Sequence, residues 1–314
     1  MTKLTQEHKQ TIIELIKQKV LSLKTASAVA SFCGVSESII SLMLKNKYVT
    51  KGDDAWITIG MKLGWKPQLH KMQGWVTVET RDLKSIETIC IDAKENSLFL
   101  PISDNAGMGK TKGLEYVAQK YHSAEVYSLR CREWGAIEFL GKLCSTLGIN
   151  TSKGMHKKEQ LLDYVIDFFQ QRSIGKPLLI LDEANKLKDA AKRVMIPLYN
   201  ECEDFLGVVW AGPEDLEKDV LRGVRYAKKG FDEIYSRFGR KFIKLRGATL
   251  NEVSKICKAN GFEDEQRIKL AFEKHKPQRI LVKENGNQVS LQVMKDLRWI
   301  KPMVKIGRKT LFTQ

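Results

Sequence analysis

The chain has 314 residues, 43% hydrophobic and 29% charged, a balance typical of a globular protein that divides into two or three domains. Lys and Arg number 53 against 37 Asp and Glu, and the resulting net charge of +16 favours polyanionic partners, nucleic acid first. No stretch is apolar enough to span a bilayer, and the polar start MTKLTQEHKQ lacks the apolar run of a secretory signal, so we expect an intracellular protein with no membrane partner.

Residues 1–70 have apolar residues at helical spacing, and TASAVASFCGVSESIISLMLKNKY places Ala30, Gly34 and Ile40 at the spacing of a helix-turn-helix. We therefore predict a DNA-binding domain over 1–70, although a helical bundle that binds no DNA shows the same pattern. The candidate contacts lie on or beside its recognition helix: Ser36, Ser38 and Lys45. Because this helix is short of Arg and Asn, non-specific or auxiliary DNA binding is favoured over operator recognition.

Residues 71–247 alternate short apolar runs with amphipathic helical stretches. The runs are SLFLPI, AEVYSLR, PLLILDEA, FLGVVWAG and KFIKL. This alternation predicts a parallel sheet covered by helices. From residue 248 the pattern returns to helices without strands and ends in a basic tail, so we predict a third, helical domain over 248–314.

The segment LPISDNAGMGKTKG follows the first apolar run and precedes a helical stretch, as a phosphate-binding loop does. Gly109 lets backbone amides approach a phosphate, Lys110 reaches the terminal phosphates of ATP, and the Thr111 hydroxyl ligates Mg²⁺. The predicted nucleotide-binding residues are Asn105, Ala106, Gly107, Met108, Gly109, Lys110 and Thr111. Asp104 stands where the pattern has its first glycine; we expect binding to survive, since Asp tolerates turn geometry, although its charge opposes that of the phosphates.

A second run, PLLILDEA, ends in two carboxylates, as expected when a neighbouring parallel strand brings an acid to the phosphates. Asp182 is predicted to hold Mg²⁺ through water, and Glu183 to polarise the attacking water as general base.

Taken together, GMGKT, LLILDEA, EIYSRFGRKF and HKPQRIL resemble the motifs of the AAA+ ATPases. The resemblance implies an α/β AAA+ P-loop module between an N-terminal all-α helix-turn-helix domain and a C-terminal helical lid. It also implies an arginine finger at Arg237, with Arg240 as the alternative, and a second sensor at Arg279 at the start of a lid helix. Because an arginine finger acts on a neighbour's nucleotide, the resemblance implies a homo-oligomer.

The order of parts narrows the resemblance to the AAA+ regulators of DNA transposition of the phage Mu type, over most of residues 20 to 285. It implies a bacterial or phage-encoded cytoplasmic protein that assembles as a helical filament on double-stranded DNA, with little sequence specificity, and activates a transposase. The candidate DNA contacts are Arg130, Arg132, Arg222, Arg225, Lys228 and Lys229. Each of them is equally well explained as a solvated surface charge.

The strand FLGVVWAG departs from that family, because Pro213 stands at the position of a polar sensor and cannot donate a hydrogen bond. We therefore predict slow hydrolysis, with ATP binding controlling the active state. An ATP-gated transcription regulator and a helicase or replication loader remain alternatives. The six cysteines are scattered without metal-ligand spacing, which favours buried free thiols over a zinc site.

Overall fold

The computed structural model describes residues 6–48, 53–63, 75–122, 124–151, 157–284 and 287–311. The chain divides into two compact units, Met1–Gly74 and Trp75–Gln314. The predicted boundary at residue 70 and the linker KPQLHKMQG fall outside the described residues.

The first unit is a bundle of four short helices. They are α1 (Gln6–Leu23), α2 (Ala26–Cys33), α3 (Glu37–Leu44) and α4 (Asp54–Lys62). Ile16, Val29, Ile40 and Trp56 meet in its core. Gly34 ends α2 with a φ of 66°, which a glycine adopts without strain, and α2 and α3 then meet at 116°. Two helices that meet at such an angle occur both in helix-turn-helix domains and in helical bundles that bind no DNA, so the helix-turn-helix role of this unit stays a prediction.

No single helix among the described residues is long and apolar enough to cross a membrane; α2 and α3 pass on length and composition only when the bent pair is taken together.

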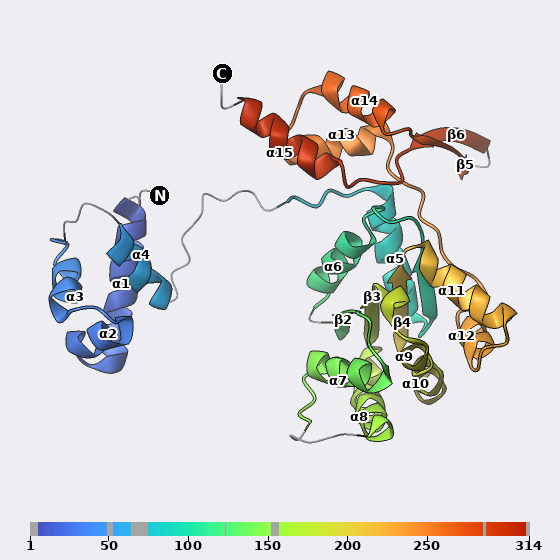
Figure 1. Cartoon of the computed structure of the whole chain (residues 1–314), viewed down its shortest axis with the longest axis horizontal. Helices are drawn as coiled ribbons and strands as arrows, with labels where there is room; N and C mark the ends of the chain where they lie inside the picture. The colour runs from blue at the N-terminus through green and yellow to red at the C-terminus, as the bar shows by residue number, and fades with distance from the viewer. Residues whose placement is uncertain are drawn as a thin grey trace. The chain divides into compact units, whose positions relative to one another are not determined.

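The second unit is built on four parallel strands (Figure 1). They are β1 (Phe99–Ser103), β2 (Val126–Arg130), β3 (Leu178–Asp182) and β4 (Gly207–Gly212), in the spatial order β1-β4-β3-β2. Every residue of β3 and β4 is buried, which explains why these strands are near-continuous apolar runs in the sequence. The prediction of a parallel sheet covered by helices is confirmed.

Helices cover both faces of this sheet, and side chains alternate between two cores (Figure 1). The helices of this part are α5 (Arg81–Glu95), α6 (Lys110–Lys120), α7 (Ala136–Leu147), α8 (Lys158–Gln170), α9 (Asp189–Lys192), α10 (Met195–Cys202), α11 (Glu214–Arg225), α12 (Phe231–Arg237) and the 3₁₀ turns η1 (Ser173–Gly175) and η2 (Ala184–Lys186).

Leu181 and Trp210 enter the core shared with α7, α8 and α10, whereas Ile180 and Val209 enter the core shared with α5 and α6.

The run KFIKL, predicted as a fifth strand, makes one isolated parallel bridge. Ile243 pairs with Ile102 of β1: its N–H donates to the Pro101 carbonyl at 2.8 Å, and its carbonyl accepts from Ser103 N at 3.1 Å. The segment therefore extends the sheet at the β1 edge without forming a strand.

The C-terminal part combines helices with a hairpin, so the prediction that it lacks strands is wrong. Its elements are α13 (Leu250–Ala259), α14 (Glu265–Lys274), β5 (Gln278–Glu284), β6 (Asn287–Val293) and α15 (Ile300–Leu311). Phe262, Phe272 and Ile300 pack in the core of this lid. In β6 the apolar residues Val289, Leu291 and Val293 alternate at period two, and β5 contains the apolar run Ile280–Val282. The two segments stand on either side of Asn-Gly in the sequence, a pair that favours two-residue hairpin loops, and they pair antiparallel.

Candidate nucleotide site

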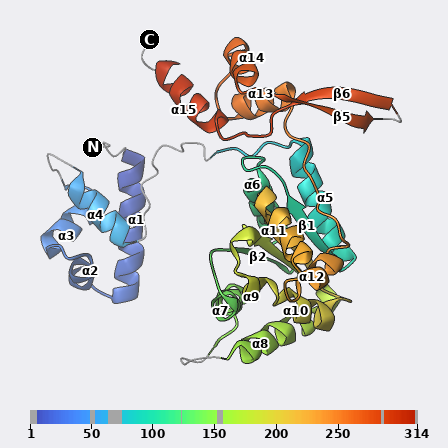
Figure 2. The same cartoon turned by 45° about the vertical axis from the view of Figure 1, so that its right-hand side comes forward.

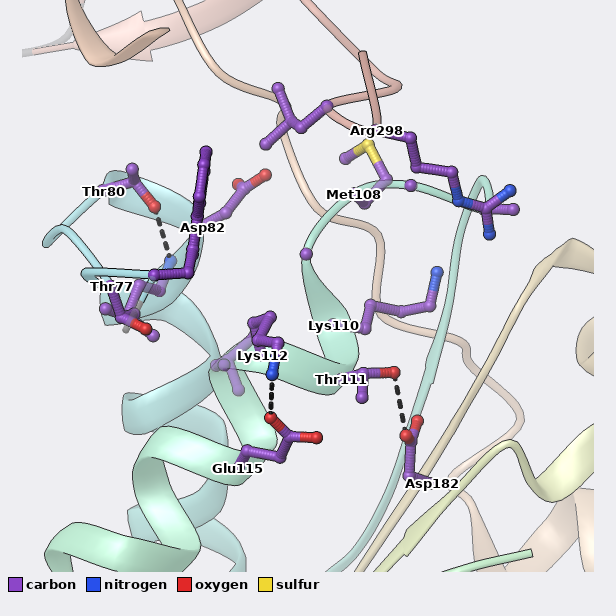
Figure 3. Close-up of a pocket in the computed structure, with 18 of the residues that line it drawn as sticks. Thr77, Thr80, Asp82, Met108, Lys110, Thr111, Lys112, Glu115, Asp182 and Arg298 are labelled. Atoms are coloured by element: carbon purple, nitrogen blue, oxygen red, sulfur yellow. Dashed lines mark hydrogen bonds and ion pairs between the residues drawn. The ribbon is translucent and has the colours of Figure 1, made fainter. Parts of the chain in front are cut away.

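The loop between β1 and α6 has the backbone of a phosphate cradle. Gly107 and Gly109 adopt φ values of 92° and 87°, and Gly109 stands at the N-cap of α6, so the helix N-terminus opens onto the loop. The Lys110 ammonium donates to the carbonyls of Asp104 at 2.7 Å and Asn105 at 2.8 Å. These bonds hold the side chain within the loop, where Figure 3 shows it.

Asp104 connects this loop to the edge of the sheet through hydrogen bonds. Its Oδ1 accepts from the Asn105 N–H and its Oδ2 from the Leu245 N–H, both at 2.7 Å. Lys295 of the lid lies 3.6 Å from the same carboxylate and offsets its charge. The residue that departs from the glycine pattern therefore has a backbone-holding role that glycine could not supply.

The two residues predicted to hold Mg²⁺, Thr111 and Asp182, lie next to each other at the end of β3. The Thr111 hydroxyl donates to Asp182 Oδ2 at 2.8 Å, because β3 ends beside the first turn of α6 (Figure 3). Burial raises the pKa of Asp182 and lowers the pKa of Lys110. Among the described residues no group of three or more His, Cys, Asp and Glu side chains could hold a metal alone, so Mg²⁺ here would share its ligands with phosphate and water.

Glu183 follows Asp182 in a left-handed conformation with a φ of 57°. Arg130, at the end of β2, lies 3.3 Å from Glu183 Oε1, and Lys186 lies 3.0 Å from Oε2. Burial opposes ionisation of Glu183, but the hydrogen bonds from Lys186 and Arg130 outweigh it and lower the pKa. Arg130, predicted as a DNA contact, therefore lies in the nucleotide cavity paired with the predicted base, while its side chain remains 63% exposed.

The other wall of the cavity was not predicted from the sequence. The cavity encloses about 620 Å³, and its lining includes residues 75–78 and 80 and the lid residues Ile256, Leu297 and Ile300. The apolar side chains among these can take a planar base. Figure 3 shows Thr77 and Thr80 on the side of the cavity away from Asp182. Nothing in the sequence placed the segment 75–80 against the loop.

Two buried polar side chains of α13 hold this wall to the lid. Asn260 exchanges hydrogen bonds with the Val76 backbone, at 2.9 Å to the N–H and 3.1 Å to the carbonyl. Glu252 completes a capping box with Thr249 and accepts from the Arg81 N–H at 2.8 Å and its guanidinium at 3.2 Å. Segment 75–81 and α13 are thereby joined at both ends of the helix.

The lid arginine in the cavity is Arg298. The Leu297 N–H donates to the Gly107 carbonyl at 3.0 Å, and Arg298 reaches from there toward Lys110 (Figure 3). Arg279, predicted at the start of a lid helix, instead lies in strand β5 opposite Gln292 and does not line the cavity. That prediction fails because residues 278–284 form a β-strand around the apolar run Ile280–Val282, which contains two β-branched residues.

Arg237 ends α12 and is held within its own chain. Its Nη2 donates to Asn200 Oδ1 at 2.9 Å, and its guanidinium carbon lies 4.8 Å from the centre of the Tyr199 ring. Arg240 is exposed and pairs with Asp232 at 3.0 Å. Neither arginine lines the cavity of its own chain.

Pro213 follows β4 and lines the cavity, at the position where sequence reasoning placed the missing sensor. Its carbonyl accepts from the Ser103 hydroxyl at 2.9 Å, and its ring nitrogen carries no hydrogen.

The remaining candidate DNA contacts lie on separate surfaces. Arg132 is exposed just beyond the carboxyl end of β2, whereas the other four lie at the C-terminal end of α11 and in the turn after it. Arg222 pairs with Asp219, and Lys228 with Asp189 at 3.2 Å. Arg225 and Lys229 are exposed.

In the helical unit, Ser36 is the N-cap of α3 and its hydroxyl lies 2.9 Å from that of Ser38. Both are exposed, as is Lys45 at the end of the helix. The exposed positions of α3 also include Glu37 and Leu42, which phosphates do not favour.

Residues 95–219 match a family model described as an AAA domain. No match was found among curated proteins. Similar solved structures include Cdc6p from Pyrobaculum aerophilum, at 16% identity over 62% of this chain and 50% of that one with a TM-score of 0.44. Two are from Aeropyrum pernix: the ORC2 protein in ADPNP-ADP complexes (12% identity, 62% and 55% covered, TM-score 0.45) and the ORC1 protein in complex with DNA (11%, 59% and 50%, 0.43).

The chain thus spans about half the length of those solved structures. The match to the AAA domain lies over the parallel sheet and the loop that precedes α6. Residues 95–219 are therefore similar to an AAA domain, and the part that matches is a parallel sheet covered by helices with a phosphate-binding loop.

Proposed function

We propose that this chain is an ATP-dependent, DNA-binding AAA+ protein that assembles on duplex DNA and recruits and activates a transposase. The observation that carries the nucleotide part is the bond between Thr111 and Asp182, because it places a hydroxyl and a carboxylate at the mouth of a glycine cradle. The DNA part is supported by the net charge of +16. The transposase is implied by the ordered sequence resemblance.

The residues present fit ATP and Mg²⁺. Thr111 and Asp182 would hold the ion, which would supply positive charge to offset that of the phosphates. Lys110 would exchange its two carbonyl partners for phosphate oxygens, and Arg298 would contribute from the lid the positive charge first predicted at Arg279. The base would lie between segment 75–80 and the lid.

Slow hydrolysis fits two features of the site. Glu183 is ionised, as a general base must be, but Arg130 and Lys186 hold its oxygens. Pro213 offers no donor where water and the terminal phosphate would meet. We infer that ATP binding sets the DNA-bound state and that hydrolysis is released only when Arg130 leaves Glu183.

Assembly on DNA is tested by electron microscopy of the full chain with long duplex DNA of arbitrary sequence. ATP should give filaments, whereas ADP, or the Lys110→Ala variant with ATP, should give none. Lys142→Ala, at an exposed lysine of α7 that does not line the cavity, is the matched control and should assemble normally.

Discrete particles at one sequence would instead indicate an ATP-gated transcription regulator. Filaments that form without nucleotide would contradict the proposed role of ATP.

A further inference from the structure

The hairpin of β5 and β6 extends away from the rest of the lid in both views (Figures 1 and 2). The two strands pair over their full lengths, from Gln278 opposite Val293 to Glu284 opposite Asn287. Among the described residues neither strand packs broadly on another helix or strand. Most of the hairpin is therefore accessible, whereas Val293 at its base is buried.

The two faces differ in chemistry because side chains alternate along each strand. One face carries two apolar cross-strand pairs, Ile280 with Leu291 and Val282 with Val289, which are half-buried and stiffen the hairpin.

The opposite face is exposed and polar, with one apolar side chain in its middle. Arg279 lies opposite Gln292, and Leu281 lies opposite Ser290. Gln288 is exposed one pair further along. Among the side chains that the structure describes on this face there is no carboxylate.

This set of side chains matches what base edges require. A two-stranded ribbon fits the major groove, where Arg recognises guanine, Gln recognises adenine, Ser accepts either partner, and an apolar side chain meets the thymine methyl. Helix α3 carries Ser38 and Ser41 between its cap residues Ser36 and Lys45, beside the acidic Glu37, and none of these side chains offers the paired hydrogen bonds of Arg or Gln. The hairpin is therefore better equipped to contact bases than the helix of the first unit.

We propose that the polar face of the β5–β6 hairpin lies in the major groove of duplex DNA. This rests on the proposed DNA binding and deepens it, because the ribbon adds a modest base preference to phosphate contacts made elsewhere on the chain.

The base of the hairpin connects this DNA contact to the nucleotide. Beyond β6, Met294 forms a bridge with Ala248, and Lys295 donates to the Leu245 carbonyl at 2.8 Å. Asp296 packs so closely on the phosphate loop that a Cβ at Gly107 would lie 2.1 Å from its Oδ1. The base of the ribbon therefore lies against the phosphate loop, and any effect of bound DNA on ATP affinity through this contact would be matched by an equal effect of ATP on DNA affinity.

The test places a photoreactive side chain on the ribbon of the full chain. Leu281→p-benzoylphenylalanine uses a position that is 70% exposed, and Leu270→p-benzoylphenylalanine, at a 65% exposed position on α14, is the matched control. With fluorescent duplex DNA and ATP, position 281 should crosslink to DNA and position 270 should not.

Affinity measurements give a second, independent readout. Arg279→Lys keeps the charge but loses the paired hydrogen bonds to guanine. This variant and Gln292→Ala should each weaken binding to the preferred sequence about tenfold and leave the salt dependence of binding unchanged. Thr146→Ala, on the exposed surface of α7, should bind as the unmodified chain does.

The outcomes separate this inference from the proposed function. Crosslinks from position 281 to a second copy of the chain, or unaltered DNA affinity in both ribbon variants, would overturn the ribbon contact and leave DNA binding intact. If the unmodified chain binds no duplex DNA, the proposed function fails and the ribbon contact fails with it.

Discussion

Glu183 is the residue on which the rate of hydrolysis depends most directly. Its carboxylate is ionised, yet one oxygen lies 3.3 Å from Arg130 and the other 3.0 Å from Lys186. A base whose oxygens both accept from cations is less able to accept a proton from water. The most exposed member of this group, Arg130, is also the one that a DNA strand at the end of β2 would meet.

Replacing Arg130 should therefore raise hydrolysis in the absence of DNA. We expect Arg130→Ala to increase the basal rate of phosphate release about two- to fivefold, because a freed general base contributes to the barrier in this range and above. The assay is phosphate release at saturating ATP, with Arg132→Ala as the control of equal charge. A lower rate in Arg130→Ala would mean that Arg130 assists catalysis.

At the scale of elements, helix α13 joins the wall of the nucleotide cavity to the lid. Glu252 accepts from the backbone and side chain of Arg81 while it caps its own helix at Thr249, and Asn260 holds Val76 at the far end. Since both side chains are buried, losing either would leave donors without partners. The lid and segment 75–81 should move as one body.

This attachment should depend on pH. Burial raises the pKa of Glu252, but hydrogen bonds from Arg81 and Thr249 outweigh burial and place it below the ordinary value of 4.5. A carboxyl with a depressed pKa stabilises the folded state above about pH 4.5, and that contribution is lost as the pH falls through the folded-state pKa. Glu252→Gln should lower the free energy of unfolding by about 1–3 kcal/mol at pH 7.

The check is chemical denaturation of both proteins across pH. The difference in free energy of unfolding between the unmodified chain and Glu252→Gln should shrink below pH 4.5. The control is Glu265→Gln, at an exposed ion pair with Lys258, which should change the free energy of unfolding by less than about 1 kcal/mol at every pH. A difference that is constant with pH would show that the charge of Glu252 is not what matters.

The sequence predicted the elements whose patterns are local and missed those set by contacts between distant segments. The strand ending at Asp182 was found because all five of its residues are buried and apolar up to the carboxylate. The hairpin was missed because SLQVMKDLRWI satisfies helical and period-two spacing alike. Arg298 was missed because its place beside Lys110 depends on the bond between Leu297 and Gly107, which no local pattern encodes.

At the scale of the whole molecule, Arg237 is the residue that would make ATP hydrolysis depend on assembly of the oligomer. Its guanidinium is bound to Asn200 and Tyr199 of its own chain, and it lies outside its own cavity. Side chains so held are positioned in advance for a partner, which is what a contact to a neighbour's nucleotide requires. The proposed oligomer gives this arginine its role.

Mixing two inactive variants tests that role. Arg237→Ala alone should lose hydrolysis on DNA by at least about 100-fold while its affinity for ATP is retained. Adding Lys110→Ala chains, which supply Arg237 but bind no ATP, should restore activity. Adding the same amount of further Arg237→Ala chains should not. Arg240→Ala is the control, and an equal loss there would transfer the role to Arg240.

All six cysteines are free and buried, and burial raises the pKa of Cys90, Cys131 and Cys202 to about 12. Thiols in such surroundings react slowly, because the thiolate is the nucleophile. A single cysteine introduced at the exposed Ser145 of α7 would therefore carry a dye at one known site without removal of the native thiols. With this one substitution, and with all six native cysteines kept, the chain is suited to single-molecule observation of its assembly.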